Sequence, residues 1–146
     1  MSTSSRFAVA VHMLSLLAMG GDKPVTSECI ADSVNTNPVV IRRIQGTLRK
    51  VGLVRAQPGA GGGASLARRP DQITLLDVYR AVGEGGIFSL PRHAPNLQCV
   101  CGRNIQAVLG GVFGQADAAV EQVLANITIA HLVQAIGARA VCPAET

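Results

Sequence analysis

Two short helical patterns separated by a tight turn lie within residues 25–51, and they constrain the fold of this chain more than any other feature. The first pattern begins at Thr26, whose side chain can cap a helix. It places Glu28 in the first turn, where the helix dipole favours a carboxylate. This first helix is predicted to end near Ser33, directly before the turn.

The turn leads into a second helix. Asn35 tolerates left-handed backbone angles, and Asn37 with Pro38 supplies an N-cap and a first helical residue that needs no N–H donor. The apolar residues of the second helix recur at spacings of three and four, so they share one face toward a core. These residues are Ile41, Ile44, Leu48 and Val51. The segment is therefore predicted to form a helix-turn-helix.

The other faces of the second helix carry basic and polar side chains, namely Arg42, Arg43, Gln45, Arg49 and Lys50. In helix-turn-helix proteins, the N-terminal part of such a helix lies in the major groove of DNA, where side chains meet base edges. A solvated basic face without a partner is the alternative explanation of the same pattern.

A glycine-rich hairpin follows. Gly52 ends the second helix, residues 53–57 are predicted to form a strand, and a return strand is expected near residues 64–67. Four glycines within residues 59–63 permit backbone angles that side chains forbid and allow main-chain N–H groups to approach phosphates. A nucleotide-binding loop is the alternative, but the Gly-Lys-Ser/Thr ending of a P-loop is absent from the sequence. The hairpin is therefore predicted to be the wing of a winged helix-turn-helix.

The charge distribution favours double-stranded DNA as a partner. Residues 1–70 contain nine basic and three acidic side chains, a net charge of +6, whereas residues 71–146 contain four basic and six acidic side chains, a net charge of −2. Phosphates that are neutralised by Arg or Lys release counterions, so DNA binding should weaken as salt is added. With three Phe, one Tyr and no Trp, a stacking platform for RNA or single strands is not expected.

Besides a long helix near the C-terminus, three shorter helices are predicted outside this region. The apolar residues 7–19 are expected to form a buried helix; this run of 13 residues is shorter than the roughly 20 needed to cross a bilayer. A membrane is therefore not an expected partner, and a cytoplasmic location is expected. A helix at residues 73–82 with Thr74 as its cap should close the small core, and Thr128 can cap a final short helix at residues 127–133.

A long apolar stripe begins near Asn104 and extends over about twenty residues. Its members are Ile105, Val108, Leu109, Val112, Phe113, Ala116, Val120, Val123 and Leu124. Exposure of such a stripe would be costly in water, so a second copy of the chain is expected to cover it in a symmetric homodimer. The predicted organisation is a DNA-binding domain at residues 1–82, a loop and candidate sensing region at 83–103, and a dimerisation helix with a C-terminal segment at 104–146.

Several of these segments together carry a family resemblance: residues 30–33, 48–54, 61–63, 73–78 and 127–130. They resemble the Rrf2 family of bacterial winged-helix transcription regulators over nearly the whole chain. The resemblance implies a mainly α fold, a winged helix-turn-helix with a two-stranded wing and a long C-terminal dimerisation helix. It also implies a dimer that binds pseudo-palindromic promoter DNA, usually as a repressor.

The pattern and the resemblance together predict which residues contact DNA. They are Thr26, Asn37, Val39, Arg42, Arg43, Arg49, Arg55, Gly61, Gly62 and Gly63. The sequence departs from the family at two positions, because the arginine that often precedes the wing glycines is Pro58 here and the tyrosine that follows them is Ala64. Minor-groove reading by an arginine at that position is therefore not expected, and Arg55, Arg68 or Arg69 could compensate.

The cysteines bear on what such a regulator could sense. Family members that hold an iron–sulfur cluster carry three widely spaced cysteines before the long helix, because thiolates hold the irons. This chain has only Cys99 and Cys101 there, so no cofactor is predicted. A cluster or zinc site in which His93, or residues of a partner subunit, join these two cysteines is the alternative, giving a metal-responsive or iron–sulfur-responsive regulator with a non-standard ligand set.

Our preferred hypothesis for the signal is thiol oxidation at Cys99, with Cys101 and Cys29 as further redox candidates. Positive charge on Arg92, His93 and Arg103 could lower the pKa of Cys99 and raise its thiolate content. A bridge from this pair to Cys29 or Cys142 is sterically easier than a bridge within it. The third explanation is that all four cysteines stay reduced and have no role.

The sequence does not predict an enzyme. The three histidines, at positions 12, 93 and 131, are dispersed, and neither paired carboxylates nor a Ser, His and Asp arrangement stands out. A protein-interaction module without DNA binding is the stronger competitor, since the long apolar stripe alone would serve it.

Overall fold

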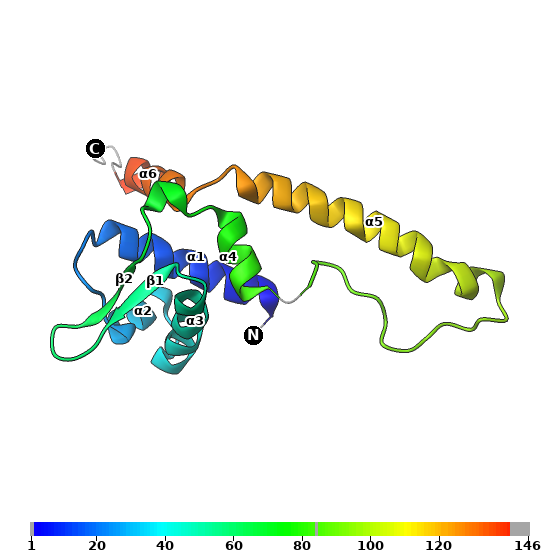
Figure 1. Ribbon diagram of the computed structural model, residues 1–146, viewed down its shortest axis with the longest axis horizontal. Coiled ribbons are helices and arrows are strands. Elements are labelled where there is room, and N and C mark those ends of the chain that lie inside the picture. Colours follow the sequence, from blue (N-terminus) through cyan, green and yellow to red (C-terminus); the bar gives the residue numbers. More distant parts are fainter. Residues whose placement is uncertain (1, 84, 141–146) are drawn as a thin grey trace, which may run out of the picture.

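The computed structural model of the chain describes residues 2–83 and 85–140. Most of the elements form a small domain, and one long helix extends away from it (Figure 1). In chain order, the elements are α1 (Thr3–Met19), α2 (Ser27–Val34), α3 (Pro38–Lys50), β1 (Val54–Gln57), β2 (Gly63–Leu66), the 3-10 helix η1 (Pro70–Gln72), α4 (Leu75–Val82), α5 (Val100–Ala125) and α6 (Ile129–Ala140).

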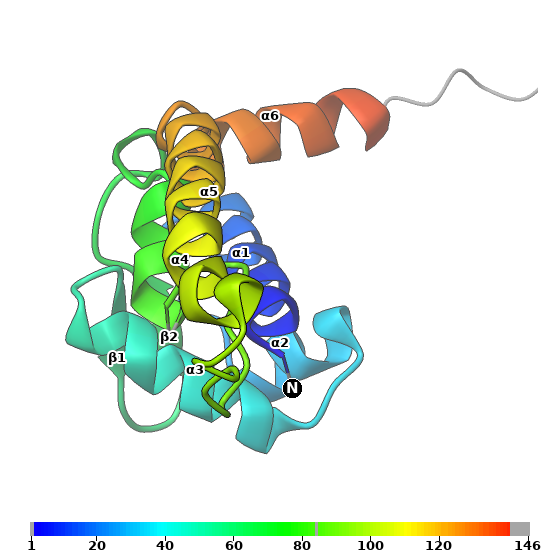
Figure 2. The ribbon, with the colours of Figure 1, turned by 90° about the vertical axis from the view of Figure 1, so that its right-hand side faces the viewer.

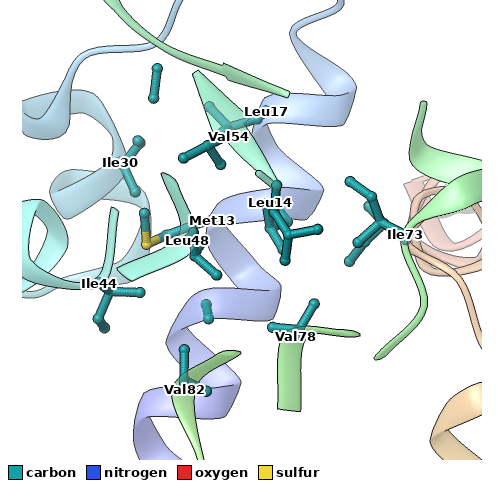
Figure 3. Packing of buried hydrophobic residues seen from close by; sticks show 14 of the residues in the cluster. Met13, Leu14, Leu17, Ile30, Ile44, Leu48, Val54, Ile73, Val78 and Val82 are labelled. Carbon is teal, nitrogen blue, oxygen red and sulfur yellow. The ribbon is translucent and has the colours of Figure 1, made fainter. Parts of the chain in front are cut away.

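Helix α1 runs through the core of the domain. It confirms the predicted first helix but begins at Thr3, because Ser2 caps it by accepting a hydrogen bond from the Ser5 N–H. Its buried side chains meet those of α3, β1 and α4 (Figure 3). The fully buried residues include Met13, Leu14, Leu17, Leu48, Val54, Ile73 and Val78. Burial of these side chains is the main source of stability for so small a domain.

The helix-turn-helix forms by the local interactions that the sequence predicts. The Thr26 hydroxyl accepts a hydrogen bond from the Cys29 N–H at 3.1 Å, and α2 ends at Val34 because the next residue, Asn35, has a left-handed φ of 63°. The Asn37 side chain accepts from the Val39 N–H at 2.8 Å, with Pro38 as the first residue of α3. One expectation is wrong: Val51 is 45% exposed, because α3 ends at Lys50 and Val51 caps it outside the buried face.

The wing is a two-stranded antiparallel hairpin in which Val54 pairs with Leu66 and Gln57 with Gly63. A third segment joins it, because Val25 and Ala64 exchange two backbone hydrogen bonds of 2.9 and 2.8 Å. These bonds tie the hairpin to the start of α2. The position of the wing relative to the helix-turn-helix is therefore set by backbone pairing.

Helices α4 and α6 close the other side of the core. Thr74 and Asp77 form a reciprocal capping box at the start of α4. The backbone around Thr74 pairs with that around Thr128, where Leu75 N–H donates to the Ile127 carbonyl at 2.8 Å. Helix α6 begins at Ile129 and reaches Ala140, so the short final helix predicted at residues 127–133 starts later and is longer.

Helix α5 begins at Val100 and not at Asn104, so the irregular segment before it is shorter than predicted. None of its residues is buried, and it extends away from the domain (Figure 1). The predicted apolar stripe consists of a part that the chain covers and a part that stays exposed. Phe113 stacks on Phe88 of the preceding loop, with ring centroids 5.2 Å apart, whereas Val108, Val112 and Val123 are more than half exposed.

Candidate nucleic-acid interface

The outer face of α3 is basic and is not covered by the rest of the described chain. Val39, Arg42, Arg43, Arg49 and Lys50 are exposed, whereas the side chains of Ile41, Ile44 and Leu48 are buried on the opposite face. Helices α3 and α6 lie on opposite sides of the domain in both ribbon views (Figures 1 and 2). The structure therefore leaves this face open to a partner.

Two contacts fix α3 against the start of α2. The Arg42 guanidinium donates to the Glu28 carboxylate at 2.6 Å, and the Ser27 hydroxyl donates to the Gln45 side-chain oxygen at 3.3 Å. The spacing of Glu28 and Arg42 in the sequence does not indicate this pair, because the two residues are brought together only by the packing of α2 on α3. Glu28 therefore restrains the Arg42 guanidinium, although both side chains stay more than half exposed.

The remaining cations of α3 have no such restraint. Within the described residues, the side chains of Arg43, Arg49 and Lys50 make no hydrogen bond or ion pair. Their charges are therefore available to an anionic partner, in contrast to that of Arg42.

The wing glycines are required by the hairpin itself. A Cβ atom on Gly62 would overlap the carbonyl oxygen of Gln57, and one on Gly63 would lie 2.5 Å from the carbonyl oxygen of Val25. Gly61 is exposed at the tip, but the Gly62 N–H already donates to the Gly59 carbonyl. The backbone of the hairpin therefore explains by itself why residues 62 and 63 are glycines, without the predicted contact with DNA.

Arg55, Arg68 and Arg69 line an open cleft of about 710 Å³ beside the wing. Each of them has an internal partner. Arg55 donates to the Leu66 carbonyl at 3.2 Å, Arg68 to the Val51 carbonyl at 3.4 Å, and Arg69 to the Asp71 carboxylate at 2.6 Å. The structure thus gathers the arginines that could replace the missing wing arginine, but carboxylates also offset the charges of two of them, since Arg69 pairs with Asp71 and Arg68 lies 3.9 Å from Asp77.

The cysteines Cys29, Cys99 and Cys101 are exposed free thiols, and Cys142 lies outside the described residues. Cys99 is the N-cap residue of α5, at the end of the loop that precedes the helix, and Cys101 lies in the first turn of that helix. The backbone N–H groups of Gly102 and, to a smaller extent, Cys101 lower the pKa of Cys99. These backbone hydrogen bonds, and not the predicted positive charge on Arg92, His93 and Arg103, lower the pKa of Cys99.

A family-model match covers residues 3–135, and its description is an iron-dependent transcriptional regulator, Rrf2. The chain belongs to the Rrf2 family. It is 44% identical to YwnA, a candidate HTH-type transcriptional regulator of Bacillus subtilis, over 84% of this chain and 90% of that protein.

Solved structures agree with this assignment. A crystal structure of a candidate DNA-binding protein is 41% identical and has a TM-score of 0.70, covering 87% of this chain and 97% of that one. The structure of IscR from T. potens shares the fold, with a TM-score of 0.75 at 24% identity over 98% of this chain and 93% of that one.

Family membership confirms the predicted fold and the assignment as a DNA-binding transcription regulator that is not an enzyme. No helix among the described residues has the length and hydrophobicity to cross a membrane.

The described residues do not fit the iron that the family description names. Within residues 2–83 and 85–140, no three His, Cys, Asp or Glu side chains form a group that could hold a metal ion. Cys99 and Cys101 therefore lack a third ligand in the described part of the chain, and His93 does not supply it. An iron–sulfur cluster is held by four protein ligands, usually cysteines, and Cys99 and Cys101 supply only two of them.

Proposed function

We propose that two copies of the chain pair through α5 and present two α3 helices to successive major grooves of one DNA duplex. The observation that carries this proposal is the exposed face of α3, on which Arg43, Arg49 and Lys50 have no partner within the described residues. An amphipathic helix with its apolar side in the core and its basic side in solvent has the form of a recognition helix. Arg and Lys side chains on that side would contact phosphates and base edges.

The N-terminal part of α3 is the part proposed to read sequence. Asn37, Val39, Arg42 and Arg43 lie in its first two turns, and Thr26 lies at the start of the neighbouring helix α2. The guanidinium group of an arginine can donate two hydrogen bonds to the O6 and N7 acceptors of guanine. Arg49 and Lys50, in the last turn, and Arg55 of the wing are proposed to contact phosphates, as is the glycine tip at Gly61.

The wing is proposed to lie along the DNA backbone beside the groove that α3 enters. The backbone pairing of Val25 with Ala64 fixes the hairpin next to α2, so its exposed tip projects from the same side of the domain as the helix-turn-helix. Close approach of backbone N–H groups to phosphates would position the protein without reading bases.

Pairing through α5 is proposed because this helix exposes apolar side chains that the described chain does not cover. Val100, Val108, Val112 and Val123 are 53 to 68% exposed. A substitution of Val112 by Asp should convert the dimer to a monomer in sedimentation equilibrium, whereas a substitution of Gln134 by Asp, at an exposed polar position of α6, should not. A wild-type protein that sediments as a monomer at micromolar concentration would contradict pairing.

The DNA-binding proposal is tested by selecting duplexes from fragments of the source genome and measuring their affinity. The Arg42→Ala/Arg43→Ala double variant should lose at least about ten-fold in affinity, because a bidentate base contact contributes about 1–3 kcal/mol. Arg80→Ala is the control, since Arg80 pairs with Glu121 between α4 and α5 and is not part of the basic face of α3. Retained affinity in the double variant would refute the proposed interface.

A protein-interaction module is the competing function. Its apolar interface should respond little to salt, whereas DNA binding should weaken steeply between 50 and 300 mM salt.

We further propose that the bound dimer represses transcription by occupying promoter DNA. Transcription in vitro from a selected promoter should fall as the protein is added, and a rise would show activation instead.

We also propose that oxidation of Cys99 regulates binding. Its thiol is exposed, and the N–H groups at the start of α5 lower its pKa and favour the thiolate. Attack of the thiolate on hydrogen peroxide forms a sulfenic acid and releases hydroxide, with two electrons passing from sulfur to the peroxide. Oxidation would act on the proposed dimerisation helix, because Cys99 caps it.

The thiol proposal is tested with Cys99→Ser and Cys29→Ser variants. Peroxide should weaken operator binding by the wild type and the Cys29→Ser variant but not by Cys99→Ser. Equal loss in all three proteins, or no loss in the wild type, would show that Cys99 has no sensing role.

A further inference from the structure

Gly46 lies near the middle of α3, on its outer side. Residues three or four apart share a helix face. Gly46 therefore lies one turn after Arg42 and Arg43 and one turn before Arg49 and Lys50, all of which are exposed. The basic face of α3 thus contains a gap without a side chain at its centre.

The fold does not require glycine at this position. A Cβ atom on Gly46 would meet no heavy atom within 4 Å, and Gly46 does not have a positive φ. Gly62 differs in this respect, because the wing backbone leaves no room for a side chain there. Glycine inside a helix also destabilises it relative to alanine, since more backbone freedom is lost on folding. Neither packing nor backbone conformation therefore explains Gly46.

We infer that Gly46 is the position at which the DNA duplex approaches the backbone of α3 most closely. This inference rests on the proposed function and deepens it. Glycine is the residue that permits close approach of a helix backbone to a ligand. With Gly46 against the groove, Arg42 and Arg43 on one side and Arg49 and Lys50 on the other can reach the duplex together. A side chain at Gly46 would hold the helix away from all four.

The inference predicts that folding stability and DNA affinity change in opposite directions. Gly46→Ala should raise the melting temperature by roughly 2–4 °C, the shift expected for a helix-propensity gain in a chain of this size. Its affinity for the duplex that the wild type selects from a random-sequence pool should nevertheless fall. Gly46→Leu adds more bulk without a hydrogen-bonding group, so it should lower the affinity further, by about ten-fold or more.

Gly137→Ala is the matched control. Gly137 lies in α6, is exposed, and would also meet no atom within 4 Å if it carried a Cβ. Because α6 lies on the opposite side of the domain from α3, Gly137→Ala should raise the melting temperature and leave the affinity unchanged (Figure 2). Circular dichroism melting and fluorescence anisotropy with the selected duplex measure the two quantities.

Two results would overturn the inference, and they are distinguishable. If the wild type selects a duplex and both Gly46 variants bind it as tightly as the wild type does, the duplex does not approach α3 at Gly46, although the proposed function stands. If the wild type selects no duplex, the proposed function fails and the inference fails with it.

Discussion

Replacing Glu28 by Gln should strengthen the electrostatic part of DNA binding while hardly changing the stability of the fold. The Glu28 carboxylate lies 2.6 Å from the Arg42 guanidinium, and the two side chains are 65% and 55% exposed. Exposed pairs of this kind contribute about 0.2–1 kcal/mol to stability. The free energy of unfolding should therefore fall by no more than about 1 kcal/mol.

The effect on binding follows from the charge that Glu28 offsets. Glu28→Gln leaves Arg42 with an unpaired unit charge on the outer face of α3. One more neutralised phosphate makes the slope of log K against log salt concentration steeper by about 0.9. Between 50 and 200 mM salt, the ratio of variant to wild-type affinity should therefore change by about three- to four-fold, with the variant favoured at low salt.

The assay is a fluorescence anisotropy titration of a random-sequence duplex at several salt concentrations. Glu121→Gln is the control, because it makes the same change in net charge but frees Arg80 between α4 and α5. The plot of log K against log salt concentration for Glu121→Gln should run parallel to that of the wild type. A parallel plot for Glu28→Gln would refute the reasoning, since Arg42 would then not face the duplex. Equal steepening in both variants would show an effect of net charge alone.

Three further predictions concern the fold and the thiols. Leu48→Ala should lower the free energy of unfolding by about 2–5 kcal/mol in urea denaturation, because Leu48 is fully buried; a loss below about 1 kcal/mol would show that the core collapses around the cavity. Gly63→Ala should destabilise the protein by about 1–3 kcal/mol, since its φ is 153° and the new Cβ would press on the Val25 carbonyl; unchanged stability would mean that the wing shifts freely. Cys99 should reach half of its maximal alkylation rate at a lower pH than a free thiol such as N-acetylcysteine, because its lowered pKa keeps the thiolate present further down the pH scale. Coincident pH profiles, measured by mass spectrometry, would contradict this.

The local features of the fold were predictable because each depends on residues that are close in the chain. A capping side chain and the N–H group that it satisfies are two or three residues apart, as Asn37 and Val39 are. Apolar spacing likewise identified the buried face of α3, apart from Val51, which lies beyond the helix end. The start of α5 was placed four residues late, because Cys99 caps the helix without the hydroxyl or carboxylate that marks most N-caps.

The sequence by itself determined the helix-turn-helix, the glycine hairpin, the concentration of positive charge in the first half and the family resemblance. Only the tertiary structure decided which cations are free, because the pairing of Arg42 with Glu28 depends on how α2 packs against α3. It also decided where the wing lies, through the bonds between Val25 and Ala64, and which apolar residues of α5 stay exposed. Such contacts join residues that are distant in the chain, so spacing and propensity carry no record of them.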